Sequence, residues 1–149
     1  MERRTFVETQ ILSQFYRIKD VEFLQMGVHH SLKVASIAAV LASLYNESQE
    51  LAYIAGLCHD CYTYLWNQPN HHAEKGALYT MQLLRESNLF HETEIEMITR
   101  AIHYHSKKQV RHDLFCQILK CADAIATNLT SDAPIDVTSI INFYLKQLD

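Results

Sequence analysis

Turn-forming residues are scarce in this chain, which has only three glycines and two prolines among 149 residues. A β-sandwich or β-barrel needs many tight reversals, and glycine and proline supply the backbone conformations that those reversals require. The scarcity therefore disfavours an all-β fold. Together with the 48% of hydrophobic residues, it also excludes collagen-like and disordered chains. A chain of this length predicts one domain with a sizeable core.

The spacing of hydrophobic residues is helical along nearly the whole chain; for example, Ile95, Ile98 and Ile102 recur at intervals of three and four. Residues 61–70 contain aromatic side chains without a period, and Pro69 interrupts them, so a loop is predicted there. The sequence predicts an all-α helical bundle of about seven helices in a single domain, 1–149, with helices at about 5–18, 21–45, 51–59, 71–86, 92–105, 114–122 and 135–148.

The same periodicity predicts which side chains face the core. In helix 21–45 the expected stripe includes Ile37 and Leu44, and in helix 71–86 it includes Leu78 and Leu84. Two small-residue features accompany these stripes. Ala52, Ala55 and Gly56 form a stripe that allows the close approach of another helix. Glycine inside a helix costs about 1 kcal/mol relative to alanine, so close packing is also expected at Gly76.

The net charge of −4 and the pI of about 6.1 lack the basic character of a nucleic-acid-binding domain, so we expect no nucleic-acid partner. No secretory signal is evident at the start of the sequence. The longest apolar stretch, Ile37–Leu44, is far too short to span a bilayer. These features predict a cytoplasmic protein without a membrane partner.

The four cysteines include the pair Cys58 and Cys61, whose spacing occurs in redox motifs and in zinc sites. No second pair of this spacing follows, because Cys116 and Cys121 are five residues apart, and thioredoxin-like strands are not predicted. In a reducing compartment we interpret all four as small, buried apolar residues.

Nine histidines are the other unusual feature of the composition. Neighbouring helical residues point about 100° apart, so each histidine can be compared with the apolar face of its helix. Three histidines and one aspartate extend the apolar faces of four different helices: His30, His59, His105 and Asp123. Asp60 is adjacent to one of them. If these faces converge, the imidazoles and carboxylates could jointly bind a cation.

The sequence resembles the HD superfamily of metal-dependent phosphohydrolases. The residues that carry the resemblance follow the order H…HD…H…H…D within a motif-bearing core of about 21–128. They are His30 in HHSLKVA, His59 and Asp60 in AGLCHD, His72 in HHAEKGA, His105 in AIHYHS, and Asp123 in ILKCADAI. A lone HD dipeptide is common by chance, whereas the ordered set with its apolar flanks is a strong signal.

The resemblance implies an all-helical fold in which these side chains surround one or two divalent cations. The first cation would be bound by His30, His59, Asp60 and Asp123. Asp60 would bridge to a second cation, bound also by His72 and His105, and Asp60 and His59 are the expected catalytic residues. This set of imidazoles and carboxylates suits iron, manganese, cobalt or zinc, and magnesium is also compatible.

Neighbouring histidines leave three alternatives open: His29 in place of His30, His71 in place of His72, and His103 in place of His105. The helical stripes favour His30 and His105. For His72 the support is the family-like spacing to Gly76 and Ala77. The remaining histidines are expected at the surface: His29, His71, His91, His103 and His112.

The resemblance implies a small phosphorylated substrate, in our leading hypothesis a nucleotide, which needs positive partners. Lys107, Lys108 and Arg111 closely follow His105 and are predicted to bind it, with a solvated connection between helices as the alternative. The aromatic residues of 61–70 could form a wall for a nucleobase, but a small satellite core is the favoured interpretation.

The leading hypothesis is a divalent-metal-dependent phosphohydrolase in which a metal-activated water attacks phosphorus. The alternatives are a mixed-valence di-iron oxygenase of the HD fold and a non-catalytic module that binds metal or nucleotide. Many HD phosphohydrolases follow the HD dipeptide with a lysine, whereas this chain has Cys61, Tyr62 and Thr63 there, which argues against the cyclic-dinucleotide phosphodiesterase branch. The first and last helices are each apolar on one side and could bury a partner copy in a homo-oligomer.

Overall fold

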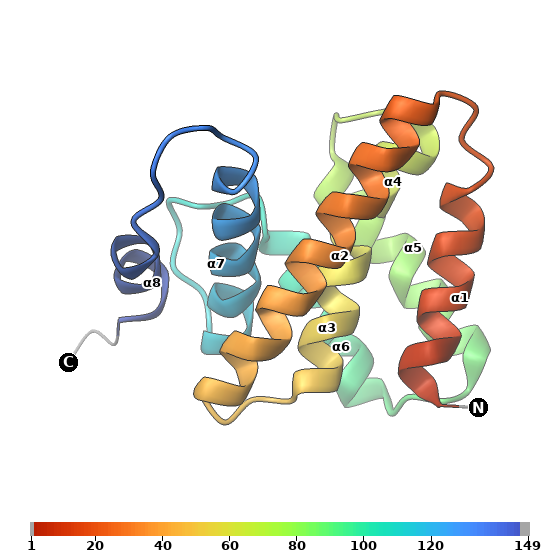
Figure 1. Ribbon diagram of the computed structural model, residues 1–149. Helices are drawn as coiled ribbons and strands as arrows, with labels where there is room; N and C mark the ends of the chain where they lie inside the picture. Colours follow the sequence, from red (N-terminus) through yellow and green to blue (C-terminus); the bar gives the residue numbers. More distant parts are fainter. Residues whose placement is uncertain (1, 147–149) are drawn as a thin grey trace.

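A computed structural model describes residues 2–146, and these residues form α-helices joined by short connections, with no strand among them (Figure 1). The helices are α1 (Arg3–Phe15), α2 (Val21–Leu44), α3 (Gln49–Cys58), α4 (Cys61–Trp66), α5 (His72–Ser87), α6 (Glu92–Tyr104), α7 (Leu114–Asn128) and α8 (Val137–Leu145). The predicted all-α fold is confirmed.

Short polar side chains fix the starts of four helices. Asp20, Ser48, Asp113 and Asp136 each accept a hydrogen bond from the backbone N–H three residues later, at 3.0–3.2 Å. Each cap satisfies an amide that has no partner within its own helix. The sequence thus marks these helix starts locally.

Asparagine supplies several of the chain reversals for which glycine is the usual residue. Asn46, Asn67 and Asn88 have φ angles of 59°, 50° and 55°, whereas no glycine has a positive φ among the described residues. Asparagine tolerates this left-handed region better than most residues do. A chain with few glycines can therefore still turn sharply between helices.

The helix α2 is the centre of the bundle and packs chiefly against α3 and α7. On one side, α1 packs against α3; on the other, α8 packs against α7 (Figure 1). The pair α5 and α6 completes the bundle, with α6 in contact with both α3 and α7. The residues of the H…HD…H…H…D motif therefore lie on helices that are neighbours in space.

Two glycines differ in how closely other atoms approach them. A Cβ atom built on Gly56 would lie 2.7 Å from the Cα atom of Ala35, so α3 and α2 approach each other there more closely than any side chain allows. The stripe of small residues on α3 has the role that its sequence predicts. At Gly76 the nearest atom, the carbonyl oxygen of His59, would be 3.6 Å away, an ordinary contact. The close packing expected at Gly76 is therefore not found.

The segment 61–70, predicted as a loop, begins with the short helix α4. Tyr62 and Trp66, four residues apart, stack with ring centroids 4.6 Å apart, and Trp66 also meets the edge of Tyr79. A single turn gives too short a run to register as a hydrophobic period. Tyr62 and Trp66 thus form a small satellite cluster with Tyr79, whereas Tyr64 packs against Phe15 and Phe23.

Some residues expected on core-facing stripes are at the surface. Leu44 is 70% exposed and Leu78 is 64% exposed, while Ile37 is half-buried. In α5 the buried face is formed instead by small side chains that carry little hydrophobic signal: Ala73, Gly76, Ala77 and Thr80, with Leu84 at the end. Periodicity of large residues alone therefore misplaces the inner face of α5.

Among the described residues one helix, α2, is long and apolar enough to cross a membrane by length and composition. Its mean hydropathy reaches 1.3 over its most apolar window of 18 residues, which is longer than the apolar stretch Ile37–Leu44. Core helices of globular bundles pass the same test, and α2 packs between α3 and α7. The finding is weak evidence for a membrane span.

All four cysteines are free and buried, as the sequence predicts. Burial raises the pKa of Cys58 to about 12, so its thiol stays protonated at neutral pH. These residues act as small apolar side chains of the core.

Candidate metal centre

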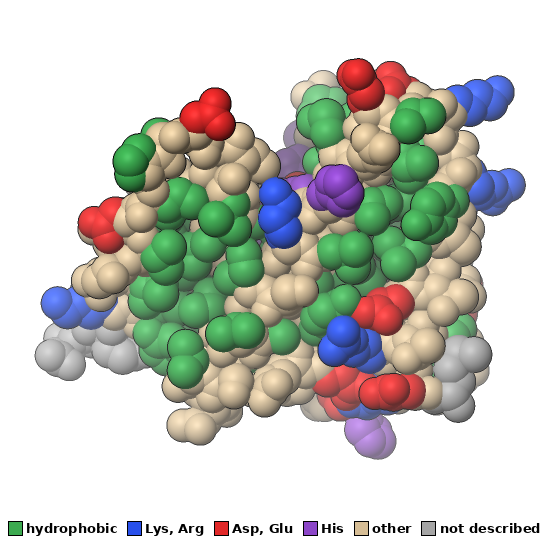
Figure 2. Space-filling model, viewed as in Figure 1, with side chains coloured by type: hydrophobic (Ala, Val, Ile, Leu, Met, Phe, Trp, Pro, Cys, Tyr) green, Lys and Arg blue, Asp and Glu red, His purple; other side chains and the backbone are tan. Residues whose placement is uncertain are grey.

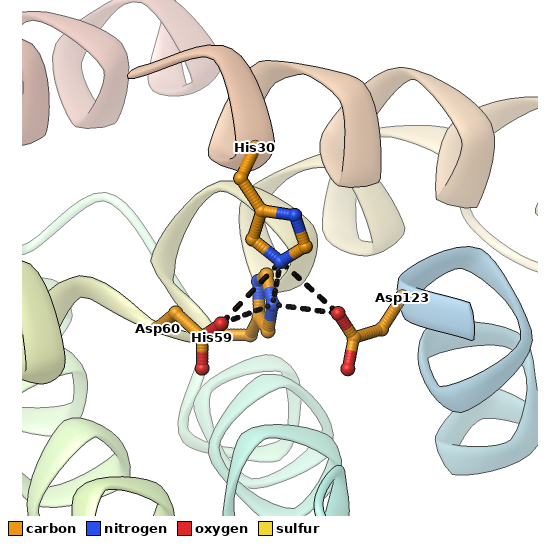
Figure 3. Close-up of side chains that lie close together, drawn as sticks. All are labelled: His30, His59, Asp60 and Asp123. Carbon is orange, nitrogen blue, oxygen red and sulfur yellow. Dashed lines mark hydrogen bonds and ion pairs between the residues drawn. The ribbon is translucent and has the colours of Figure 1, made fainter. Parts of the chain in front are cut away.

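Four side chains from α2, α7 and the junction between α3 and α4 form a first cluster: His30, His59, Asp60 and Asp123 (Figure 3). The Nε2 atom of His30 lies 3.2 Å from Nε2 of His59 and 3.1 Å from Oδ1 of Asp123. The Oδ2 atom of Asp60 lies 3.1 Å from Nε2 of His59 and 3.4 Å from Nε2 of His30. Ligands placed about 2.0–2.2 Å from one cation have separations of this size.

A second cluster consists of Asp60, His72 and His105. The two imidazole Nε2 atoms are 3.2 Å apart. The Oδ1 atom of Asp60 lies 3.3 Å from Nε2 of His72 and 3.1 Å from Nε2 of His105. This group offers three ligands and leaves room for a solvent molecule or a substrate, as catalytic rather than structural metal sites do.

Asp60 belongs to both clusters, with Oδ2 directed to the first and Oδ1 to the second. Its backbone, at φ −112° and ψ 11°, is not helical and separates α3 from α4. His59 is the residue directly before Asp60 and forms the C-terminal cap of α3. The helix break thus presents an imidazole and a carboxylate from consecutive residues to one centre.

The other candidate ligands come from helix ends and from two helix interiors. His72 begins α5 and His105 caps the C-terminal end of α6, while His30 and Asp123 lie within α2 and α7. Before α5, His71 has a left-handed backbone with φ 56°, an uncommon conformation for a residue other than glycine. This local turn sets the direction in which α5, and with it His72, starts.

Backbone carbonyls orient three of the four imidazoles. The Nδ1–H groups of His59 and His105 donate to Gly56 O and Ile102 O, each at 2.6 Å, and that of His72 donates to Pro69 O at 2.9 Å. In the neutral ring, Nε2 then carries the lone pair, and it faces the cluster. Two such lone pairs at 3.2 Å in the second cluster repel each other unless a cation lies between them. The donor set therefore fits a divalent cation.

The carboxylates of the centre remain ionised despite their burial. Burial alone would raise the pKa of Asp60, but His59 and His105 hold it well below the usual value. Burial would likewise raise the pKa of Asp123, and the neighbouring imidazoles of His30 and His59 hold it well below. Two buried anions of this kind require positive partners, which protons or metal ions can supply.

The pKa values of the imidazoles are shifted to different degrees by the same carboxylates. Burial would lower the pKa of His59, but Asp60 and Asp123 raise it to about 10. At His105 burial dominates, and the pKa is lowered in spite of the hydrogen bond to Asp60. Without a metal, protons would therefore gather on the His59 side of the centre.

The three basic residues predicted to bind substrate lie in different surroundings in the structure. The Nζ atom of Lys108 lies 2.7 Å from Oδ2 of Asp123 at the edge of the first cluster. Lys107 is exposed, with its Nζ atom 5.5 Å from the centroid of the Tyr104 ring. Arg111 is exposed and donates a hydrogen bond to the carbonyl of Lys146. The structure brings Lys108, and neither of the other two, to the centre.

The structure brings together all six residues predicted as ligands and none of the alternative histidines. His29 and His71 are exposed, and His103 lines a surface groove between α5 and α6. His91 is exposed at the start of α6. His112, expected at the surface, is half-buried, and its Nδ1 atom lies 2.6 Å from the buried ammonium of Lys120.

A cavity of about 510 Å³ opens onto the first cluster. Figure 2 shows a hollow near the upper middle of this face, with Lys or Arg and His side chains at its edge. Besides His30, Asp60 and Asp123, its walls contain residues that the sequence reasoning did not select: Met26, His29, Lys33, Tyr64, Thr127 and Thr130. For Lys33 a signal existed, because it follows His30 by one helical turn.

Comparisons with known proteins agree with this geometry. A family model described as HD domain matches residues 27–128. A search of curated proteins finds no match. Among solved structures, a predicted HD superfamily hydrolase from an uncultured Thermotogales bacterium superposes with a TM-score of 0.67 at 23% sequence identity, covering 91% of this chain and 83% of that chain. At this identity the structural likeness supports the fold.

Proposed function

The chain belongs to the HD domain family, and on this premise we propose that it is a divalent-metal-dependent phosphohydrolase acting on a nucleotide or a related small phosphate ester. The observation that carries the proposal is the position of Asp60. Its two carboxylate oxygens lie 3.1 Å from imidazole nitrogens of different clusters, which is the arrangement that a bridged pair of cations requires.

The bound cations would be held by His30, His59, Asp60 and Asp123 in the first cluster and by Asp60, His72 and His105 in the second. When bound, such ions lower the pKa of a coordinated water toward neutrality and neutralise the charge of phosphoryl oxygens. The mixture of imidazole and carboxylate ligands favours iron, manganese, cobalt or zinc, and is compatible with magnesium.

Groups of the protein hold the imidazoles in place for the reaction. The carbonyls that accept from Nδ1 of His59, His72 and His105 keep each Nε2 aimed at the centre. Asp60 holds the two clusters in fixed relation, and with His59 it forms the catalytic pair of the proposal. Lys108, whose Nζ atom lies 2.7 Å from Oδ2 of Asp123, supplies a positive group beside the first cluster for a phosphoryl oxygen.

The test is hydrolysis of a panel of nucleotides and model phosphoesters by protein loaded with manganese, iron, cobalt or magnesium. We expect release of phosphate with at least one ion, and a loss on the order of a hundredfold or more in Asp60→Ala, because both clusters lose a ligand. The matched control is His103→Ala, which removes an imidazole outside both clusters and should leave the rate unchanged.

Three results would contradict the proposal in different ways. Metal-loaded protein without activity on the panel, together with Asp60→Ala behaving like the wild type, would exclude a role for the centre in catalysis. Oxygen uptake after anaerobic iron loading would identify the di-iron oxygenase instead. Nucleotide binding without turnover would identify a non-catalytic binding module.

A further inference from the structure

Two adjoining hollows on this face share the side chains of His29 and Lys33. The first is the cavity of about 510 Å³ that opens onto the cluster. The second, of about 490 Å³, is mainly apolar, and its other walls are Leu32, Ser36, Ile37 and Leu129. A ligand that extends from the cluster past Lys33 therefore passes from a charged region into an apolar one.

Lys33 stands between the two hollows as an available cation. It follows His30 by three residues on α2, which places it about 4.5 Å further along the helix axis. Surface arginines such as Arg4 and Arg100 are paired with carboxylates. Within residues 2–146, Lys33 forms no such ion pair. Its ammonium is therefore free to meet an anionic group of a ligand.

We propose that the substrate is an organic diphosphate, with its terminal phosphoryl group at the metal centre, its second phosphoryl group at Lys33 and its organic group in the apolar hollow. This inference rests on the proposed phosphohydrolase function. Lys33 is then the residue that selects diphosphates, because it meets the charge next to the reacting phosphorus. Leu129, which is 50% exposed, becomes part of the floor beneath the organic group.

An organic monophosphate fits these surroundings less well. With its phosphoryl group at the centre, its uncharged carbon group would lie against Lys33. The ammonium would then lose water without gaining an anionic partner, which is unfavourable. A diphosphate satisfies Lys33 and still reaches the apolar hollow. The metal centre, Lys33 and the apolar hollow thus follow one another in the same order as the terminal phosphoryl group, the second phosphoryl group and the organic group of the substrate.

The reaction that follows is hydrolysis of the anhydride. Water adds to the terminal phosphorus and releases one proton to solvent, and the bond between that phosphorus and the bridging oxygen breaks. The products are orthophosphate and the organic monophosphate, and the bridging oxygen leaves with the electron pair. Its negative charge develops on the second phosphoryl group, where the ammonium of Lys33 stabilises it.

Equilibrium binding tests the inference independently of turnover. The probes are adenosine monophosphate and the non-hydrolysable α,β-methylene analogue of adenosine diphosphate, titrated by calorimetry into manganese-loaded protein. We expect the diphosphate analogue to bind about tenfold more tightly or better, as one charge-assisted contact gives. Lys33→Gln should remove this preference and leave monophosphate binding unchanged. The control Lys19→Gln removes a lysine that lies outside both hollows.

Equal binding of the two probes by wild-type protein, or an equal loss for both in Lys33→Gln, would overturn the inference. If either result accompanies phosphate release from other esters, the phosphohydrolase function stands and the diphosphate specificity fails. A diphosphate preference without hydrolysis of any substrate would sustain the binding inference and contradict the proposed function.

A second arm identifies the organic group. A methylene-bridged alkyl diphosphate is compared with the adenosine analogue in wild-type protein and in Leu129→Ser. The control is Leu44→Ser, a change at an exposed leucine of α2 that does not line either hollow. Weaker binding in Leu129→Ser alone is expected, and the probe that binds more tightly shows whether the hollow accepts a nucleobase or an aliphatic chain. No effect of Leu129→Ser on either probe would show that the organic group lies elsewhere.

Discussion

At Asp60 a single carboxylate lies within 3.4 Å of four imidazole nitrogens, those of His30, His59, His72 and His105. Asp123, in contrast, shares its two oxygens between imidazoles and the ammonium of Lys108. Protons and metal ions compete for the Nε2 lone pairs around these anions. The charge state of the centre, and with it the stability of the fold, therefore depends on pH and on metal.

The first prediction concerns the pH dependence of stability in metal-free protein. The pKa of His59 is raised to about 10 in the folded chain from an ordinary value of 6.5. A raised pKa means that folding favours the protonated ring, so this contribution is complete below pH 6.5 and is lost as the pH rises to about 10. Urea unfolding with a chelator present should show this loss, and His59→Gln should lack it.

Other groups titrate in the same range, so the comparison must be between variants. Burial lowers the pKa of Lys120 to about 8, and a lowered lysine pKa makes stability increase as the pH rises. This opposing effect is common to wild-type protein and His59→Gln and cancels in their difference. A difference between the two proteins that stays constant from pH 6 to pH 10 would contradict the assignment to His59.

The identity of most of these side chains could be predicted, but their separations could not. The stripe of α2 selects His30 over His29, because helix periodicity fixes which face is buried. His72 follows a left-handed turn at His71, and no periodicity reaches across such a turn, so its selection depended on the resemblance. Lys33 was missed although it follows His30 by one helical turn, because a half-buried lysine shows no role until the cavity beside it is seen.

At the scale of the helices, the contact between α2 and α3 depends on Gly56, and this gives the second prediction. A Cβ atom at this position would lie 2.7–2.9 Å from backbone atoms of Val34 and Ala35, which cannot move aside without shifting the helix. Gly56→Ala should therefore lower the free energy of unfolding by at least about 2 kcal/mol. Chemical denaturation at neutral pH measures this change.

Gly76→Ala is the matched control, since it adds the same methyl group within another helix. The nearest atoms would be 3.6–3.8 Å away, so no overlap results. Alanine also favours the helix over glycine by about 1 kcal/mol, and Gly76→Ala should be neutral or stabilising. Similar destabilisation by both variants would show that the close contact of α2 with α3 is not the cause.

The connection between α6 and α7 depends on a buried lysine, which gives the third prediction. The Nζ atom of Lys120 donates to the carbonyl of Val110 at 2.7 Å and lies 2.6 Å from Nδ1 of His112. The His112 ring in turn stacks on Tyr104, with centroids 4.0 Å apart. Lys120→Met should release this connection, which contains Lys108, at a cost of about 1–3 kcal/mol in stability.

Hydrogen exchange measures the release, and faster exchange should be confined to amides of residues 106–113. The control Lys107→Met removes an exposed lysine of the same connection and should leave exchange unchanged. Uniformly faster exchange over the whole bundle would mean that Lys120 acts on global stability and not on this connection.

The helix starts were largely predictable, because the apolar spacing is a local property, whereas α7 continues to Asn128, beyond the predicted end at 122. The inner face of α5 was not predictable, since it consists of Ala73, Gly76, Ala77 and Thr80, whose burial follows from the approach of neighbouring helices. The short helix α4 also escaped prediction, because one turn is stabilised by the contacts of Tyr62 and Trp66 more than by its own periodicity.

At the scale of the whole molecule, the candidate ligands join α2, α3, α5, α6 and α7 at one point. A metal ion bound there would cross-link helices that are distant in the sequence and would bind the folded chain in preference to the unfolded one. Occupied by metal, the centre is thus expected to contribute to the stability of the entire bundle as well as to chemistry.

The fourth prediction follows from this linkage. At an ion concentration a hundred times the dissociation constant, binding adds about 2.7 kcal/mol of stability, or about 5–10 °C in the unfolding temperature of a domain this size. Adding manganese to chelator-treated protein should produce this increase in a calorimetric scan. Asp60→Ala should abolish it, His72→Ala should retain the part due to the first cluster, and His103→Ala should match wild type. An unfolding temperature that does not respond to any of the divalent ions would show that these helices meet without a metal between them.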